Sequence, residues 1–176
     1  MATDKLSPAE YATLPQGDLR LLGSDVAQEL LHSKELARLA YTALDGTPRV
    51  LPIMFHWNGR EIVLASFAGA AKLPALTKRP EVALTIDTSA HPPHILLVRG
   101  SVVMDEVDGV APEFRAANIR YGGEDFGNRR IAEVDRPGLK MVRLVVEPTW
   151  VGVLDFQVRF SGQRSSTDFA RRGQVS

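Results

Sequence analysis

Short apolar runs separated by tight-turn dipeptides fill the middle of the chain, and they limit the folds that it can adopt. Residues 36–44, 49–57 and 61–66 are apolar runs of strand length, separated by Asp45-Gly46 and Asn58-Gly59. Asn-Gly is typical of the two-residue type I′ hairpin turn, in which both central residues need a positive φ. The pattern therefore predicts two successive hairpins, which together form an antiparallel meander.

The remaining residues add further strands and a few short helices. Strands are predicted at 82–87, 95–104, 139–146 and 150–156, with Glu147-Pro148-Thr149 breaking the last two apart. Helices are predicted to begin at Ser24-Asp25 and to span 72–79 and 112–121, whereas 122–137 has the charged composition of a loop with one helical turn. Because helices do not alternate with strands, the pattern favours an α+β fold, a closed or split antiparallel barrel of six or seven strands, over a doubly wound sheet.

The length of 176 residues suits a single domain with a real hydrophobic core. We expect an N-terminal arm at 1–20, a folded domain at 21–160 and a disordered polar tail at 161–176. The chain contains no cysteine, which excludes a disulfide scaffold, thiolate zinc sites and iron–sulfur clusters.

The charge is balanced, with 21 basic and 21 acidic residues. Nucleic-acid binding needs a concentrated basic surface, and neither half of the chain has an excess of that kind. No stretch approaches the roughly 20 apolar residues that a membrane span requires, and the N-terminus is polar. We therefore expect a cytoplasmic protein that works on a small molecule, without a nucleic-acid or membrane partner.

The segment from Ser66 to Lys72 has the composition of an anion site. A predicted strand ends at Ser66, a loop of small residues follows, and Lys72 precedes a helix with Pro74 in its first turn. Backbone N–H groups at a helix start attract phosphates, and a bound anion would offset the unfavourable position of a lysine there. The alternative is an ordinary surface lysine after a loop. His91 and His94 flank two prolines and do not share a helix face, so no metal site is predicted.

The order of these elements resembles the pyridoxamine 5′-phosphate oxidase-like family of flavin-binding proteins. The resemblance covers roughly residues 28–155 and rests on motifs that occur in the family's order: Leu36 to Ala40, Asp45 to Phe55, Ser66, Gly69 to Lys72, Lys78 to Asp87, Val98 to Gly100, and Glu147 to Trp150. It implies a six-stranded split barrel that forms a homodimer. It also implies that FMN or the deazaflavin F420 binds in a groove at the dimer interface.

The resemblance also implies which residues meet the cofactor. Lys72 matches the family's phosphate-binding basic residue, and Ser66 matches a hydroxyl residue that meets the same phosphate. Val50, Leu51 and Pro52 match the segment that borders the isoalloxazine ring. Arg49 falls near a basic residue that contacts the phosphate or the ribityl chain, and Trp150 falls where an aromatic residue of the partner subunit approaches the cofactor, unless it is a core aromatic.

Departures from the family pattern narrow the expected activity. Ala71-Lys72 replaces the Arg-Lys of true pyridoxamine phosphate oxidases, and no histidine follows Trp150, so vitamin B6 oxidation is not expected. Pro74-Ala75 replaces the Arg-Asn pair of many F420-binding relatives.

We expect an FMN-binding oxidoreductase or flavin reductase in which the cofactor carries the hydride to a small-molecule acceptor. An F420-dependent reductase and a non-catalytic flavin or haem carrier are the alternatives. Haem would need axial ligands from among His32, His56, His91 and His94, with Met54, Met104 or Met141 as a possible second ligand.

Overall fold

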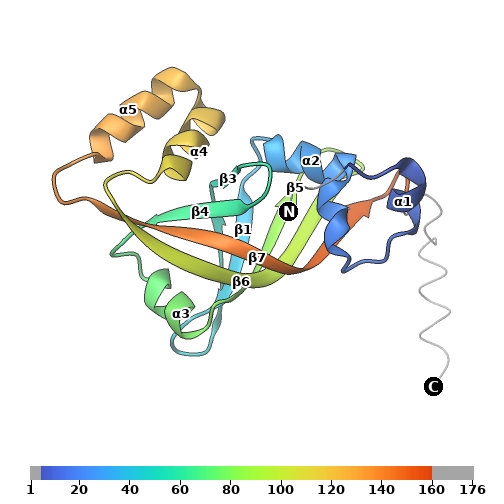
Figure 1. Cartoon of the computed structure of the whole chain (residues 1–176), viewed down its shortest axis with the longest axis horizontal. Coiled ribbons are helices and arrows are strands. Elements are labelled where there is room, and N and C mark those ends of the chain that lie inside the picture. The colour runs from blue at the N-terminus through green and yellow to red at the C-terminus, as the bar shows by residue number, and fades with distance from the viewer. Residues whose placement is uncertain (1–4, 160–176) are drawn as a thin grey trace.

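A single antiparallel sheet forms the body of the protein (Figure 1). The structure, a computed structural model, describes residues 5–159, so the tail expected at 161–176 lies outside the described residues. Seven strands pair in the order β2-β1-β5-β6-β7-β4-β3. They are β1 (Ala37–Thr42), β2 (Pro48–Ile53), β3 (Phe55–Trp57), β4 (Ile62–Phe67), β5 (Glu81–Asp87), β6 (His94–Asp108) and β7 (Lys140–Asp155). The predicted antiparallel α+β fold is confirmed.

Short helices connect the strands and cover the ends of the sheet. They are α1 (Pro8–Thr13), the 3₁₀ helix η1 (Leu19–Gly23), α2 (Asp25–His32), α3 (Lys72–Lys78), α4 (Pro112–Gly122) and α5 (Glu124–Val134). Figure 1 shows α4 and α5 on one side of the long β6–β7 pair and α3 on the other, with α1 and α2 toward the far end. Among residues 5–159, no helix has both the length and the apolar character needed to cross a membrane.

The predicted meander is wrong, although both of its hairpins form. β1 pairs with β2 and β3 pairs with β4, but β2 and β3 lie at opposite ends of the sheet. Met54 lies between them, where the apolar run 49–57 divides into two strands. Their burial differs: Val50 on β2 is 68% exposed, whereas Phe55 and Trp57 on β3 are buried. One apolar run thus supplies both edges of a curled sheet, as a split barrel requires.

The turn after β3 also differs from the predicted type I′ geometry. No residue other than glycine has a positive φ anywhere in residues 5–159, so Asn58 does not adopt the conformation that a type I′ turn needs. Instead, Asn58 Oδ1 accepts hydrogen bonds from the backbone N–H groups of Arg60 at 2.9 Å and Glu61 at 2.7 Å. Within this turn, Gly59 is the residue with a positive φ, of 90°. The Asn-Gly pair therefore makes a tight turn by side-chain capping.

The segment 122–137, predicted to be a loop with one helical turn, is mostly helical. Gly123, with φ of 84°, separates α4 from α5. α5 exposes most of its charged residues and buries Ile131 and Gly127. A Cβ on Gly127 would lie 2.7 Å from the Ile119 side chain, so the two helices pack closely. Because α5 buries only these two residues, its sequence lacks the repeating apolar positions from which a helix is predicted.

The prediction that residues 147–149 break the last strand in two is wrong. β7 runs without interruption from Lys140 to Asp155 and pairs with β6 along its length. A register shift between Arg99 and Gly100 on β6 absorbs the irregularity, with Gly100 opposite Pro148. Pro148 lies beyond the stretch of β7 that pairs with β4, residues 141–146, so β7 has one strand neighbour there, and proline is found in such edge positions and at bulges.

Candidate functional site

Ser66 and Lys72 lie together at the end of β4. Ser66 is 5% exposed and stands next to the last residue of this strand, opposite Val142 of β7. Lys72 is the first residue of α3, which begins one short loop later. The Lys72 Nζ donates a hydrogen bond to Ser66 Oγ at 2.7 Å. The structure therefore brings together the two residues that the sequence assigns to a phosphate.

The Lys72 ammonium has no negative partner within residues 5–159. None of the described carboxylates forms an ion pair with Lys72, and burial lowers the pKa of its ammonium group. A half-buried cation without a counterion is unfavourable unless a ligand supplies the charge. The donor set of an ammonium and a hydroxyl fits the oxygens of a phosphate. The side chains present therefore fit a phosphate-bearing cofactor.

An open groove of about 580 Å³ lies between α3 and the β6–β7 strands, and its lining includes Leu73, the chain neighbour of Lys72, but neither Lys72 nor Ser66. Val142 on β7 pairs with Ser66 on β4 and with Glu106 on β6. Paired residues point to the same face of a sheet, so the Ser66 hydroxyl lies on the face where Val142 and Glu106 line the groove. The lining is mostly apolar and consists of Ala68, Leu73, Pro74, Thr77, Met104, Glu106 and Val142. Such a surface suits a largely apolar planar group beside a charged anchor.

Arg49 and the segment predicted to border the isoalloxazine ring, residues 50–52, lie on β2. Among the described residues, no hydrogen bond links Arg49 to Lys72 or Ser66. The Arg49 guanidinium binds Asp45 Oδ2 at 3.1 Å and Thr47 Oγ1, so its charge is already paired. Arg49 and Val50 line a second open groove, of about 460 Å³. Leu51 is half-buried and Pro52 is exposed on the same strand. A cofactor phosphate at Arg49 would have to displace Asp45.

Trp150 lies on β7, at the other end of a row of paired residues that begins at Val50 in the second groove. Val50, Ala40, Ala83, Arg99 and Trp150 follow one another on β2, β1, β5, β6 and β7. The Arg99 guanidinium lies 4.1 Å from the centroid of the half-buried Trp150 ring, a cation–π contact. Trp150 is thus half-buried at the β7 end of this row.

Sequence reasoning missed a charged pair beneath α4. Glu113 on α4 is 9% exposed, and Arg143 on β7 binds both of its carboxylate oxygens, at 2.6 and 3.0 Å. Burial raises the pKa of Glu113, but hydrogen bonds from Arg143 outweigh it and leave the pKa below its ordinary value. The available signal was Arg143 itself, a charge inside the apolar run 139–146.

Two of the four histidines proposed as alternative haem ligands have hydrogen-bonding neighbours. His32 Nδ1 lies 2.8 Å from Gln28 O, and His94 Nδ1 lies 3.1 Å from Glu29 Oε2. Burial, with a smaller effect of Arg120, lowers the pKa of His56. Within residues 5–159, no three histidine, aspartate or glutamate side chains are grouped so that they could hold a metal ion.

Comparison with solved structures finds several similar folds. An F420 reductase is 26% identical, with 71% of this chain and 94% of that one covered and a TM-score of 0.53. A conserved hypothetical protein from Mycobacterium tuberculosis is 16% identical over 94% of each chain, with a TM-score of 0.59. A pyridoxamine 5′-phosphate oxidase-related, FMN-binding protein from Nostoc punctiforme is 11% identical over 74% of this chain and 78% of that one, with a TM-score of 0.51. No protein-family model and no curated protein matches the sequence.

These likenesses define the class of the fold. The chain has the split-barrel fold of the pyridoxamine 5′-phosphate oxidase-like proteins, and the family resemblance predicted from its sequence is confirmed. Proteins with this fold include both FMN-binding members and an F420 reductase.

Proposed function

We propose that the protein binds a phosphate-bearing flavin or deazaflavin and serves as an oxidoreductase for a small-molecule acceptor. The main observation in support is the half-buried Lys72 ammonium, which has a hydroxyl partner but no carboxylate partner among the described residues. When bound, the cofactor supplies the hydride chemistry. Ser66 and Lys72 hold its phosphate, and the apolar groove beside them excludes water from one side of the ring.

FMN is the first candidate cofactor. Its phosphate carries about two negative charges, of which the Lys72 ammonium balances one while the Ser66 hydroxyl adds a hydrogen-bonding group. True pyridoxamine phosphate oxidase activity is not proposed, because no histidine follows Trp150. The active unit is a homodimer in the cytoplasm, with Trp150 of one subunit approaching the cofactor of the other.

The deazaflavin F420 is a second candidate, and the 26% identity to an F420 reductase favours it. The long anionic tail of F420 needs additional basic residues beyond the phosphate site. Lys78 and Arg99 are exposed, and no described carboxylate pairs with either. They are available to bind such a tail.

A binding titration of the purified protein tests this function. FMN and F420 are added separately, and their absorption and fluorescence report binding. We expect saturable binding of one of them, followed by electron transfer when NADPH, NADH or a substrate of the reduced deazaflavin is supplied. A protein that binds neither cofactor contradicts the proposal, and one that binds without any electron transfer is a carrier.

A further inference from the structure

The N-terminal arm takes the place of a missing strand beside the end of β7. β4 pairs with β7 only up to Val146, so the described part of β7 beyond that point has β6 as its single strand neighbour. Gly17 N–H donates to Val151 O at 2.8 Å. The Gln16 carboxamide donates to Val153 O at 2.7 Å and accepts from Val153 N–H at 2.9 Å. The side chain of Gln16 thus pairs with β7 as a backbone peptide group would.

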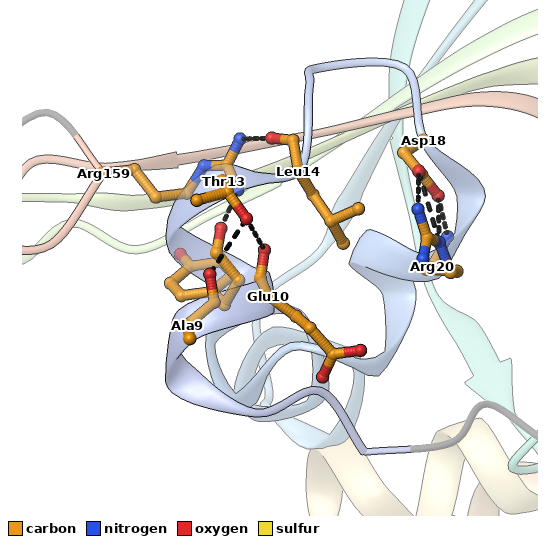
Figure 2. Close-up of polar contacts among 8 residues, drawn as sticks. Ala9, Glu10, Thr13, Leu14, Asp18, Arg20 and Arg159 are labelled. Atoms are coloured by element: carbon orange, nitrogen blue, oxygen red, sulfur yellow. Dashed lines mark hydrogen bonds and ion pairs between the residues drawn. The ribbon is translucent and has the colours of Figure 1, made fainter.

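Contacts at the end of β7 hold the arm in this position. The Tyr11 hydroxyl donates to Asp155 Oδ2 at 3.0 Å, and Asp155 is 2% exposed. Arg159 donates to the carbonyl oxygens of Tyr11 and Leu14, and Figure 2 shows its guanidinium reaching Leu14. The arm is therefore fastened to its own chain both before and after Leu14.

Trp150 fits tightly against this arm. A Cβ on Gly17 would lie 2.7 Å from Trp150 Nε1, and a Cβ on Gly152 would lie 2.4 Å from Trp150 Cη2. Contacts that short do not occur in proteins, so only glycine at both positions leaves room for the indole. Together with the Arg99 guanidinium at 4.1 Å, these neighbours fix the ring in one orientation.

We propose that Gln16 and Gly17 are positioning residues of the cofactor site, which hold the Trp150 indole ready to contact the cofactor. The inference rests on the proposed function, in which Trp150 approaches the bound ring. Holding an aromatic side chain in its binding orientation removes the entropy cost of ordering it when the ligand arrives. The arm then acts on the cofactor through Trp150 and not by direct contact.

The test compares Gly17→Ala with Gly59→Ala in the full chain. Both alanines take a backbone with positive φ, 105° at Gly17 and 90° at Gly59, but nothing lies within 4 Å of a Cβ at Gly59. The protein is labelled with 5-fluorotryptophan, and the ¹⁹F resonance of Trp150 is assigned with Trp150→Phe. The affinity for FMN or F420, whichever the wild-type protein binds, is measured by titration.

We expect Gly17→Ala to shift the Trp150 resonance and to weaken cofactor binding about three- to tenfold, the usual range for one aromatic contact. Gly59→Ala should change neither. In a Trp150→Phe background, Gly17→Ala should cause no further loss of affinity, since the residue it acts through is gone. Gln16→Met, which keeps the side-chain length and removes both hydrogen bonds to Val153, should reproduce the shift if Gly17→Ala fails to fold.

Two results separate the inference from the function it rests on. If the wild-type protein binds a cofactor and the arm variants leave the Trp150 resonance and the affinity unchanged, the positioning role is wrong and the proposed function stands. If the wild-type protein binds neither FMN nor F420, the proposed function is wrong, and the positioning role is overturned with it.

Discussion

At the scale of single residues, Lys72 gives the proposed site a pH dependence. Burial lowers the pKa of its ammonium group from the ordinary lysine value of about 10.4. A cofactor phosphate prefers the charged form of Lys72, so its affinity should be highest near pH 7 and fall as pH rises through the lowered pKa. Cofactor titrations between pH 7 and 10 should show this loss, and Lys72→Arg should abolish it because arginine stays charged. An identical pH profile for Lys72→Arg would contradict the assignment.

Asp155 controls acid stability through the arm. Burial raises the pKa of its carboxyl group, but hydrogen bonds from Val158 N–H, Gln157 N–H and the Tyr11 hydroxyl outweigh it and leave the pKa below its ordinary value. The stabilisation is therefore present above the unfolded-state pKa of about 3.9 and is lost as pH falls through the lower folded-state pKa. Thermal melts between pH 7 and pH 2 should show a smaller loss of stability for Asp155→Asn than for the wild-type protein. A loss of equal size in both proteins would show that another group controls acid unfolding.

At the scale of elements, the Glu113–Arg143 pair fastens α4 to the sheet. Glu113→Gln leaves the Arg143 guanidinium, whose side chain is 24% exposed, with the exposed Asp105 at 3.2 Å as its remaining charged partner. We expect a loss of about 2 kcal/mol in the free energy of unfolding, less than for a fully buried pair because water still reaches Arg143. Urea unfolding measures it. The exposed pair Glu106–Lys140 supplies the control, and Glu106→Gln should leave stability unchanged. Equal effects of the two substitutions would mean that Glu113 does not anchor the helix.

The same scale shows which features the sequence could predict. Strands that bury alternate residues, such as β5 with Val82, Leu84 and Ile86, were located to within a residue or two because their apolar period is a local signal. The order of the strands was not predictable in this way. The division of one apolar run at Met54, with β2 and β3 at opposite edges, depends on the curvature of the whole sheet. α5 was missed because its packing partner is another helix and not the apolar core.

In the candidate site, too, contacts between residues close in the sequence could be predicted, and contacts between distant residues could not. Ser66 and Lys72 are six residues apart, and local structure alone brings them together. Arg49 was placed near the phosphate by resemblance, but its pairing with Asp45 follows from the tight turn between β1 and β2. The contact of Gln16 with Val153 joins residues 137 positions apart, and a glutamine in a polar arm carries no sequence signal for it.

At the scale of the whole molecule, the outer face of the sheet predicts a dimer. Val50 is 68% exposed and Val103 is 49% exposed, on strands at the edge and in the middle of the sheet. The family resemblance predicts a homodimer, and we expect the second subunit to cover these two side chains. Light scattering at micromolar concentration should return twice the chain mass, and Val103→Asp should lower it. A wild-type monomer that binds cofactor fully would contradict an interface site.

The central claim is that the Ser66–Lys72 pair holds the phosphate of the cofactor, and paired substitutions on α3 test it most directly. Lys72→Ala and Lys78→Ala each remove one positive charge from the same short helix, but only Lys72 is half-buried beside Ser66. Fluorescence titration with FMN and with F420 measures the affinity of each variant. We predict that Lys72→Ala weakens binding by at least about tenfold, or ~1.4 kcal/mol, with FMN binding unchanged in Lys78→Ala. Equal affinities for Lys72→Ala and the wild-type protein would contradict the claim.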